Sequence, residues 1–369
     1  MKAVAITPHV EHSARLIDVP KPKISEIPNG RGVLVKVLKV ALDGTDRDIH
    51  EGKYGDSPPG EDYLIMGHEA FGVVEEVGPN VTELKVGEYV VPTVRRPGRS
   101  FYDQLGLQDL TSDETYYERG INLLHGYFTE YFVEEPDFLV PVPDEFSTLG
   151  VMTEPISIVE KGWEHALDIQ RRMGIWRPKR VAITGAGPLG MLAAWKFRLE
   201  RLETHVFSLE DYPNFKSDLL EETGATYHCV KDLPVAEAPS KLGKFDIVFE
   251  ATGYPPMWMD AAHVVAKNGV VILTSITPKD FYKEVELAKL NMEFVLGNKV
   301  MFGTVNASYL HFMLAVRDLG HGMNMYSGWM EKFITHELEG LEHYERALYL
   351  LNNSWEERAL KVVIKVADE

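Results

Sequence analysis

The central part of the chain contains a G-x-G-x-x-G pattern, formed by Gly185, Ala186, Gly187, Pro188, Leu189 and Gly190. A short apolar run at residues 180–183 precedes the pattern, and a segment with helical spacing at residues 189–199 follows it. In that context the glycines allow a tight turn and a close approach of the backbone to a pyrophosphate, which rests on the N-terminus of the helix. The pattern therefore predicts a dinucleotide-binding site.

Glu210 follows twenty residues after the last glycine, where the second strand of such a unit should end. A carboxylate there accepts a hydrogen bond from the ribose 2′-hydroxyl of NAD and repels the 2′-phosphate of NADP. The next ten residues contain no arginine, and Lys216 is the nearest base. Asp211 lies beside Glu210 in the same position. The sequence favours NAD; NADP stays an alternative if both acids are only solvated loop residues.

A second pattern lies nearer the N-terminus and reads G-H-E-x2-G-x5-G-x2-V, with His68 and Glu69 as its polar members. The segment Asp43-Gly44-Thr45-Asp46 lies twenty-five residues upstream of His68. With these two segments the chain resembles the zinc-containing medium-chain alcohol dehydrogenases. In that family a Cys-Gly-Thr/Ser-Asp turn and a Gly-His-Glu motif carry ligands of the catalytic zinc.

A narrower resemblance is to the archaeal glucose dehydrogenases of this superfamily, especially the haloarchaeal type. The segments that carry it are residues 60–69, 91–97, 118–121, 154–161 and 303–306. The resemblance implies a GroES-like catalytic domain, which is a partly open β-barrel, followed by a Rossmann domain. It also implies zinc-assisted hydride transfer from C1 of an aldose to NAD(P), giving the aldonolactone, with D-glucose, D-galactose or a pentose as substrate.

The resemblance implies one catalytic zinc, held by Asp43, His68, Glu69 and Glu154. Glu69 has an alternative role, because it would also serve as a group that orients His68 without binding the metal. The usual cysteine ligand is replaced by Asp43, and the harder oxygen ligand should weaken zinc binding and leave other divalent ions more competitive. The lobe at residues 95–117, where many relatives hold a structural zinc, contains no cysteine. We therefore expect no structural zinc.

The resemblance also assigns substrate and cofactor contacts. Thr45 would take the proton of the C1 hydroxyl, and sugar hydroxyls would bind Glu118, Glu154 and Asn306. A polar lining suits a polyol, since a site built on hydrogen bonds rejects analogues that lack a hydroxyl. The alternative for Glu118 is an ordinary ion pair with Arg119 or another charge. Besides the glycine loop and Glu210, cofactor contacts are expected from Leu273, Thr274, Ser275, Thr304, Val305 and Asn306.

The elements that must position these residues fall into two classes. Short β-branched runs bounded by Gly or Pro mark the first 145 or so residues, at 33–41, 70–77, 88–92 and 138–142, and predict a barrel-like antiparallel domain. From residue 179, six apolar runs alternate with helical segments, as in a doubly wound parallel sheet. The sequence predicts a catalytic domain at 1–160, to which 307–369 returns, and a Rossmann domain at 161–306.

Composition limits the partners. The net charge of −18 argues against nucleic acid or an anionic membrane, and no apolar run is long enough to span a bilayer. The single cysteine, Cys229, excludes an intrachain disulfide. A cytoplasmic location and a homo-oligomer, dimeric or tetrameric as in relatives, are the expectations.

Three other functions fit parts of the sequence. A polyol or secondary-alcohol dehydrogenase would share the fold and the metal but form a ketone in place of a lactone. A quinone reductase would share the fold without zinc, which the presence of Asp43, His68 and Glu69 disfavours. A non-catalytic cofactor-binding protein would bind NAD(P)H without turnover.

Overall fold

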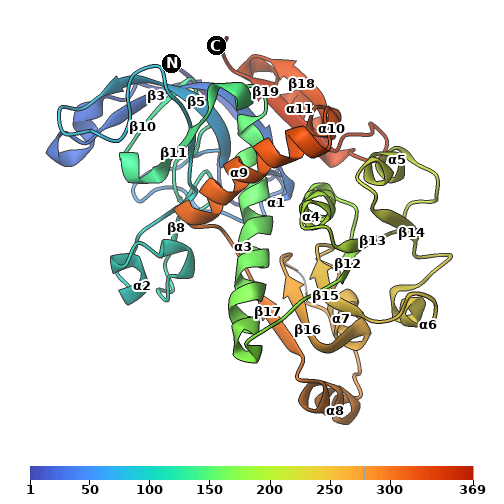
Figure 1. The fold of residues 1–369 in the computed structure, drawn as a ribbon. Helices are drawn as coiled ribbons and strands as arrows, with labels where there is room; N and C mark the ends of the chain where they lie inside the picture. Colours follow the sequence, from blue (N-terminus) through green and yellow to red (C-terminus); the bar gives the residue numbers. More distant parts are fainter. Residues whose placement is uncertain (277–279, 369) are drawn as a thin grey trace. The chain divides into compact units, whose positions relative to one another are not determined.

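The computed structural model describes residues 1–276 and 280–368. They form two compact units (Figure 1). The first consists of Met1–Ser157, Asn306–Gly320 and Met330–Glu369, and the second of Ile158–Val305 and His321–Trp329. The chain passes from the first unit to the second after residue 157 and returns after residue 305. Both positions lie close to the boundaries expected from the sequence. Residues 321–329 group with the second unit, which the sequence had not indicated.

The first unit is built around a seven-stranded sheet with the order β11-β6-β5-β3-β19-β18, in which β10 also pairs with β3. Its strands are β3 (Val33–Leu42), β5 (Glu69–Val77), β6 (Tyr89–Pro92), β10 (Tyr131–Glu134), β11 (Leu139–Val142), β18 (Ile334–Glu339) and β19 (Lys361–Lys365). The predicted strands at 33–41, 70–77, 88–92 and 138–142 are confirmed. The pairs of β3 with β5, β10 and β19 are antiparallel, and only the pair of β18 with β19 is parallel.

Strand β3 lies at the centre of this sheet because nearly every residue in it is apolar and buried. A run rich in valine and leucine fits a position that is covered on both faces. β3 pairs with β5 from Val33 to Ala41 and with β19 from Lys39 to Leu42. The sheet therefore brings the strand that begins at Glu69 and the strand that begins at Lys361 to the same end of β3.

Two smaller sheets complete the first unit. One has the order β2-β1-β4, with β1 (Lys2–Ile6), β2 (Arg15–Asp18) and β4 (Leu64–Ile65), and the other has the order β7-β8-β9, with β7 (Arg95–Arg96), β8 (Tyr117–Arg119) and β9 (Leu123–Leu124). The chain between β7 and β8 forms the lobe that carries α2 (Phe101–Gln104). The remaining helices of this unit are α1 (Gly44–His50) and α11 (Tyr344–Asn352).

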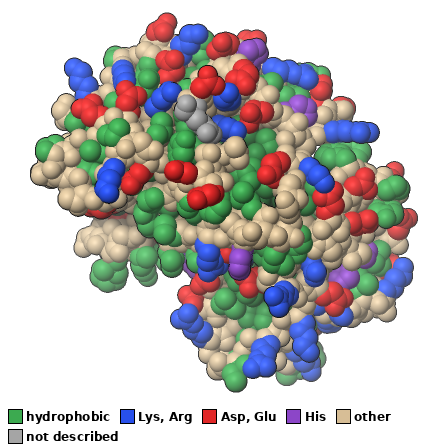
Figure 2. All heavy atoms as spheres, turned by 45° about the horizontal axis from the view of Figure 1, so that its top comes forward, with side chains coloured by type: hydrophobic (Ala, Val, Ile, Leu, Met, Phe, Trp, Pro, Cys, Tyr) green, Lys and Arg blue, Asp and Glu red, His purple; other side chains and the backbone are tan. Residues whose placement is uncertain are grey.

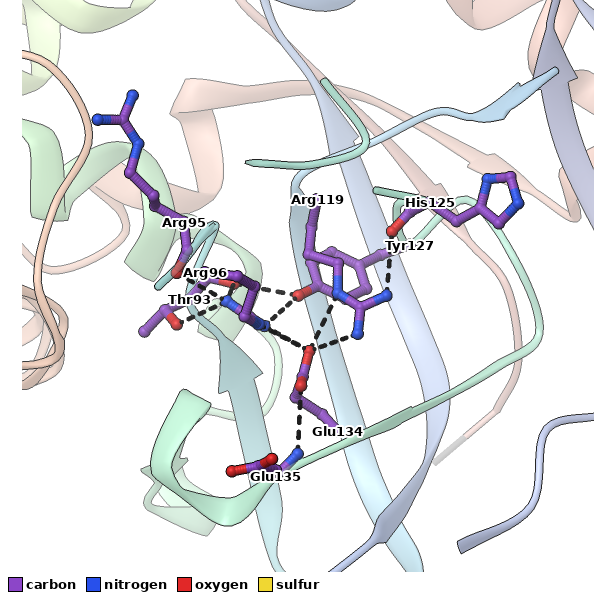
Figure 3. Close-up of polar contacts among 8 residues, drawn as sticks. All are labelled: Thr93, Arg95, Arg96, Arg119, His125, Tyr127, Glu134 and Glu135. Atoms are coloured by element: carbon purple, nitrogen blue, oxygen red, sulfur yellow. Dashed lines mark hydrogen bonds and ion pairs between the residues drawn. The ribbon is translucent and has the colours of Figure 1, made fainter. Parts of the chain in front are cut away.

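A buried ion cluster attaches the lobe to the large sheet (Figure 3). Oε2 of Glu134, at the end of β10, accepts hydrogen bonds from Nε of Arg96 and Nε of Arg119, both at 3.0 Å. Arg96 also donates to the hydroxyl of Tyr127 at 2.9 Å, and that hydroxyl donates to the carbonyl of Thr93. We call Arg96, Arg119 and Glu134 the arginine cluster. It fixes β7 and β8 against β10.

The second unit is a six-stranded parallel sheet with the order β14-β13-β12-β15-β16-β17. Its strands are β12 (Arg180–Thr184), β13 (Glu203–Ser208), β14 (Thr226–Cys229), β15 (Phe245–Glu250), β16 (Val265–Leu273) and β17 (Val300–Gly303). All six lie on the apolar runs that the sequence singled out. This is the strand order 3-2-1-4-5-6 of the dinucleotide-binding fold, with the switch point between β12 and β15.

Helices connect consecutive strands of this sheet: α4 (Pro188–Leu199), α5 (Phe215–Glu222), α6 (Ala238–Leu242), α7 (Pro255–Val264) and α8 (Leu287–Gly297). One part of the core lies between α7 and the strands, where Val264 of α7 packs among Phe207, Phe245 and Val248. Short alanine side chains, such as Ala182 and Ala261, allow the helix and the strands to approach closely at this place.

Helices α3 (Thr153–Gln170), α9 (Tyr309–Met325) and α10 (Trp329–Phe333) cross from one unit into the other. No helix among the described residues has the length and apolarity needed to cross a membrane. On the face drawn in Figure 2, acidic side chains lie among the lysines and arginines over most of the area.

Candidate active site

The N-terminus of α1 fixes the carboxylate of Asp43. Oδ1 of Asp43 accepts hydrogen bonds from the backbone N–H of Thr45 at 2.7 Å and of Asp46 at 3.3 Å, and Oδ2 of Asp46 accepts from the backbone N–H of Asp43 at 3.0 Å. This reciprocal capping box satisfies donors that the first helical turn leaves free. It also holds the hydroxyl of Thr45 3.3 Å from Oδ2 of Asp43.

His68 is brought to the same place by a turn at Gly67. Gly67 has a φ of +87°, and a Cβ at this position would lie 2.0 Å from the ring of Phe128. Only glycine fits such a backbone at such a contact. The imidazole of His68 is buried, with Nε2 at 3.5 Å from Oδ1 of Asp43 and Nδ1 at 3.9 Å from Oδ1 of Asp46.

Two further carboxylates complete a buried group. Glu154 lies in the first turn of α3, and Glu69 opens β5; both are buried. One ligand atom each from His68, Glu69 and Glu154 lie within 4.8 Å of one another, as do those from Asp43, Asp46 and His68. We call these five residues the acid cluster. The four metal ligands expected from the sequence, Asp43, His68, Glu69 and Glu154, thus fall into two groups that share His68.

Lys361 supplies a buried ammonium group beside this cluster. It forms an ion pair with Oε2 of Glu69, and both side chains are almost completely inaccessible to solvent. Its Nζ also donates to the carbonyl of Leu42 at 3.2 Å. Because Glu69 is engaged by Lys361, the carboxylate of Glu154 is the better placed of the two to bind a cation.

Burial and the neighbouring charges shift the pKa values of the acid cluster. Burial and, to a smaller extent, the negative charges of Glu69 and Asp43 together raise the pKa of Glu154 to about 8, in spite of the neighbouring His68. Burial and the charge of Asp43 likewise raise the pKa of Asp46 to about 7. For His68, burial is outweighed by Asp43 and Asp46, so its pKa lies well above the usual value.

These residues fit a divalent cation such as zinc. Imidazole and carboxylate are normal zinc ligands, and two ligand atoms on one tetrahedral zinc lie about 3.4 Å apart. The separation of Nε2 of His68 and Oδ1 of Asp43 is 3.5 Å. A cation would also relieve the repulsion among the buried carboxylates, while Asp46, on the Nδ1 side of His68, would orient the ring.

Two of the expected sugar-binding residues lie together in the first unit. Glu118, in β8, is buried, and its Oε1 accepts a hydrogen bond from Nδ2 of Asn306 at 2.8 Å. Oε1 also accepts from Nε and Nη2 of Arg95, at 3.1 and 2.6 Å. The alternative pairing of Glu118 with Arg119 is wrong, since Arg119 binds Glu134.

The glycine loop lies between β12 and the first turn of α4, as the sequence predicts. A Cβ on Gly190 would meet the carbonyl oxygen of Gly185 at 2.0 Å, whereas a Cβ on Gly187 would meet nothing within 4 Å. Because of the first contact, only glycine at position 190 lets the helix pack this closely against the loop. The open space beside Gly187 leaves its backbone accessible to a ligand at the N-terminus of α4.

Glu210 lies just beyond β13, and its carboxylate is held in place. Nζ of Lys216 is 2.6 Å from Oε1, the hydroxyl of Ser208 donates to Oε2, and the hydroxyl of Tyr227 donates to the Glu210 carbonyl at 2.7 Å. The pKa of Glu210 is lowered: burial opposes the shift, but Lys216 and Ser208 outweigh it. Glu210 is therefore an anion with an ammonium group at its side.

The other expected cofactor residues lie at the ends of two neighbouring strands. Leu273 ends β16, and the backbone N–H of Thr304, just after β17, donates to its carbonyl at 3.0 Å. The hydroxyl of Thr274 donates to the carbonyl of Glu250 at 2.7 Å. Nζ of Lys161 donates to the carbonyl of Val305 at 2.8 Å. Ser275 follows in the same loop, whereas Asn306 belongs to the first unit.

Three residues of this site had no assigned role in the sequence. Asp46 carried a local signal, because an acidic residue three positions after Asp43 completes a capping box. Lys361 carried only the weak signal of a charged residue within an apolar strand. Arg95 carried none, because its partner Glu118 lies across the lobe.

Comparisons with known proteins show which family the chain resembles. Residues 29–144 match the "Alcohol dehydrogenase GroES-like domain", and residues 147–366 match the family described as "Glucose dehydrogenase C-terminus". The chain is 40% identical over 367 residues to a glucose 1-dehydrogenase of Caldivirga maquilingensis, covering 99% of each chain. It is 39% identical over 350 residues to that of Methanocella arvoryzae, covering 94% of this chain and 96% of the relative.

Among solved structures, the fold superimposes on a glucose dehydrogenase of Haloferax mediterranei in complex with NADP, zinc and gluconolactone. The TM-score is 0.90 at 34% sequence identity, with complete coverage of both chains.

Proposed function

Because the chain belongs to the glucose dehydrogenase family of the zinc-dependent alcohol dehydrogenase fold, we propose that it oxidises C1 of D-glucose with a nicotinamide cofactor. The product would be the lactone. The observation that carries this proposal is that one unit holds both the buried acid cluster and the Glu118–Asn306 pair. A metal centre and buried hydrogen-bonding groups within one unit suit a substrate with several hydroxyl groups.

The residues that would hold the metal are Asp43, His68 and Glu154. Glu69 would act beside them, since its ion pair with Lys361 fixes its carboxylate. When bound, zinc supplies a Lewis acid that lowers the pKa of the C1 hydroxyl. Asp46 would keep the imidazole of His68 oriented with Nε2 toward the metal.

Thr45 would receive the proton of the C1 hydroxyl. Its side chain is partly exposed, and the capping box fixes its backbone beside Asp43. When bound, the nicotinamide cofactor would supply the acceptor for the C1 hydrogen as a hydride, so the sugar would lose two electrons and one proton would be released. Glu118, Glu154 and Asn306 would accept or donate hydrogen bonds to the sugar hydroxyls and so orient C1.

NAD would be the preferred cofactor because Glu210 presents a carboxylate near the expected ribose position. The positive charge of Lys216 partly offsets that of the carboxylate, so the preference over NADP should be modest. The relative from Haloferax mediterranei was solved with NADP. The variant E210Q should shift the ratio of kcat/KM values toward NADP, whereas Asp211, which is paired with exposed Lys231, offers the matched control D211N.

The direct test is the initial rate with D-glucose, using NAD and NADP in parallel, before and after the metal is removed and zinc is returned. Zinc-restored formation of a lactone would support the proposal. If no aldose reacts with either cofactor, the sugar assignment fails, and polyols and secondary alcohols become the substrates to test. A cytoplasmic location and a homo-oligomeric state also stay predictions.

A further inference from the structure

The carboxylate of Glu118 is held in an asymmetric way. Among the contacts of the described residues, the hydrogen bonds to this carboxylate all go to Oε1: two from Arg95 and one from Asn306. Because Oε1 already accepts three hydrogen bonds, it cannot accept another strong one. The second oxygen, Oε2, is the acceptor that a ligand can use.

Arg95 is fixed by its surroundings. It is the direct cross-strand partner of Glu118 in the antiparallel pair of β7 and β8, and both side chains are more than nine-tenths buried. Its guanidinium lies over the ring of Tyr116 at 4.9 Å, and the hydroxyl of Tyr116 is 2.6 Å from that of Tyr54. A planar guanidinium in contact with an aromatic ring and a carboxylate has few other rotamers to adopt.

The two arginines of β7 serve different faces of the lobe. Successive side chains of a strand point to opposite sides, and Figure 3 shows the side chain of Arg95 pointing away from Glu134, toward which Arg96 points. In the same way Glu118 and Arg119 of β8 point to opposite faces, Arg119 toward Glu134. The arginine cluster thus lies on one face of the β7–β8 strand pair, and the Arg95–Glu118 pair lies on the other face.

We propose that Arg95 is a positioning residue for sugar recognition: it occupies Oε1 of Glu118 and thereby directs Oε2 at a hydroxyl group of the substrate. The inference rests on the proposed function and adds to it a residue that touches no substrate. Tyr54 and Tyr116 support the same arrangement. Burial, the hydrogen bond with Tyr116 and the charge of Glu118 all raise the pKa of Tyr54, so its phenol keeps its proton.

The test is a double-mutant cycle on the zinc-loaded enzyme with D-glucose as substrate. R95M and E118Q should each lower kcat/KM on the order of 10- to 100-fold, mainly through KM, as expected for a hydrogen bond to a charged group. In the E118Q background, R95M should have less than about a twofold further effect. R95K, which keeps the charge but loses the planar fork, should recover only part of the loss.

A panel of monodeoxy glucoses gives a readout that a merely structural role would not change. One deoxy sugar should react equally well with the wild type, E118Q and R95M, because it lacks the hydroxyl that Oε2 binds. R99M, on the exposed part of the same lobe, is the matched control and should leave all sugars unaffected. If R95M fails to fold, R95K in the two backgrounds gives the same cycle.

The outcomes separate the two proposals. A wild-type enzyme that oxidises no aldose overturns the proposed function and this role together. A wild-type enzyme that oxidises glucose, with R95M and R95K unchanged in KM, overturns only the role of Arg95. An undiminished effect of R95M in the E118Q background also overturns it, because Arg95 would then act independently of Glu118.

Discussion

The arginine cluster and the acid cluster are both buried groups of ionisable side chains in the same unit, but their charges are balanced differently. Glu134 meets two guanidinium groups on one oxygen, and although burial opposes the shift, Arg119 and Arg96 lower its pKa to about 2. In the acid cluster, four carboxylates share His68 and Lys361, and the pKa of Glu154 is raised to about 8.

The difference distinguishes a structural from a functional buried charge. A carboxylate surrounded by cations is satisfied by the protein itself, and its role is to hold strands together. Carboxylates that raise one another's pKa carry negative charge that the surrounding side chains do not balance. A cation from outside can balance it. The arginine cluster therefore needs nothing further, whereas the charges of the acid cluster would be balanced by a metal ion.

The largest expected effect comes from H68A, which removes the one residue shared by both halves of the acid cluster. Zinc binding should be lost and the rate of glucose oxidation should fall by about 10³-fold or more, since metal activation is worth several kcal/mol. Metal content by mass spectrometry and the initial rate measure this. H125A, which removes a histidine paired with Glu61 in the same unit, should keep both; full zinc and full activity in H68A would contradict the assignment.

The converse substitution, E134Q, should act on stability and leave the metal in place. It removes the only carboxylate that the structure shows between Arg96 and Arg119, and leaving such charges buried costs about 3–5 kcal/mol of unfolding free energy. Denaturant unfolding of the zinc-loaded protein measures it. E135Q is the control, because the Glu135 side chain points away from the cluster (Figure 3); loss of zinc from folded E134Q would erase the distinction between the clusters.

The two clusters should also give opposite pH dependences of stability. Glu134 has a folded pKa of about 2, so its contribution is complete above the unfolded value near 4.5 and is lost as pH falls toward 2. Glu154 and Asp46 bind protons more tightly in the folded state, so the metal-free protein should lose a few kcal/mol as pH rises from about 4.5 to 8.

Melting temperatures measured across pH, with and without zinc, test this prediction. Zinc should flatten the decline between about pH 4.5 and 8, because it replaces the protons, and should leave the acid limb near pH 2–4 unchanged. A metal-free protein whose melting temperature rises steadily through that neutral range would show that the carboxylates do not repel one another as described.

The smallest expected effect is a change of metal preference in D43C. A thiolate is a softer ligand than a carboxylate, so zinc affinity should rise relative to that for manganese or magnesium. We expect about a tenfold change, the scale on which single substitutions around a metal site act. Competition dialysis against both ions measures it, and D48N, on the same helix but outside the cluster, is the control.

Local patterns account for the parts of the fold that the sequence predicts. The glycine loop, the strands of both sheets and the helices after 308 and 344 each have a periodicity or punctuation that acts within a few residues. Asp43 and His68 each lie in a short motif, and the family resemblance that these motifs carry implied their role as metal ligands. Glu154, Glu118 and Asn306 depended on the resemblance, since no spacing links them.

Pairings between distant segments could not be predicted. Lys361 reaches Glu69 because β19 and β5 both pair with β3, and strand order is a property of the whole sheet. The choice of Arg95 over Arg119 for Glu118 depends on which face of β8 each side chain occupies, and a three-residue strand has no periodicity to show it. Residues 321–329 group with the second unit, and the helical pattern that runs from residue 309 into this segment gave no sign of it.

The contact between Lys361 and β3 has a consequence for the order of events during protein synthesis. Nζ of Lys361 donates to a carbonyl 319 positions earlier in the chain, that of Leu42. Asp43, His68 and Glu69 thus leave the ribosome long before the lysine that neutralises Glu69, and the nascent barrel has an open edge at β3 until β19 arrives. The acid cluster therefore reaches its final balance of charges only when β19 pairs with β3, late in the synthesis of the chain.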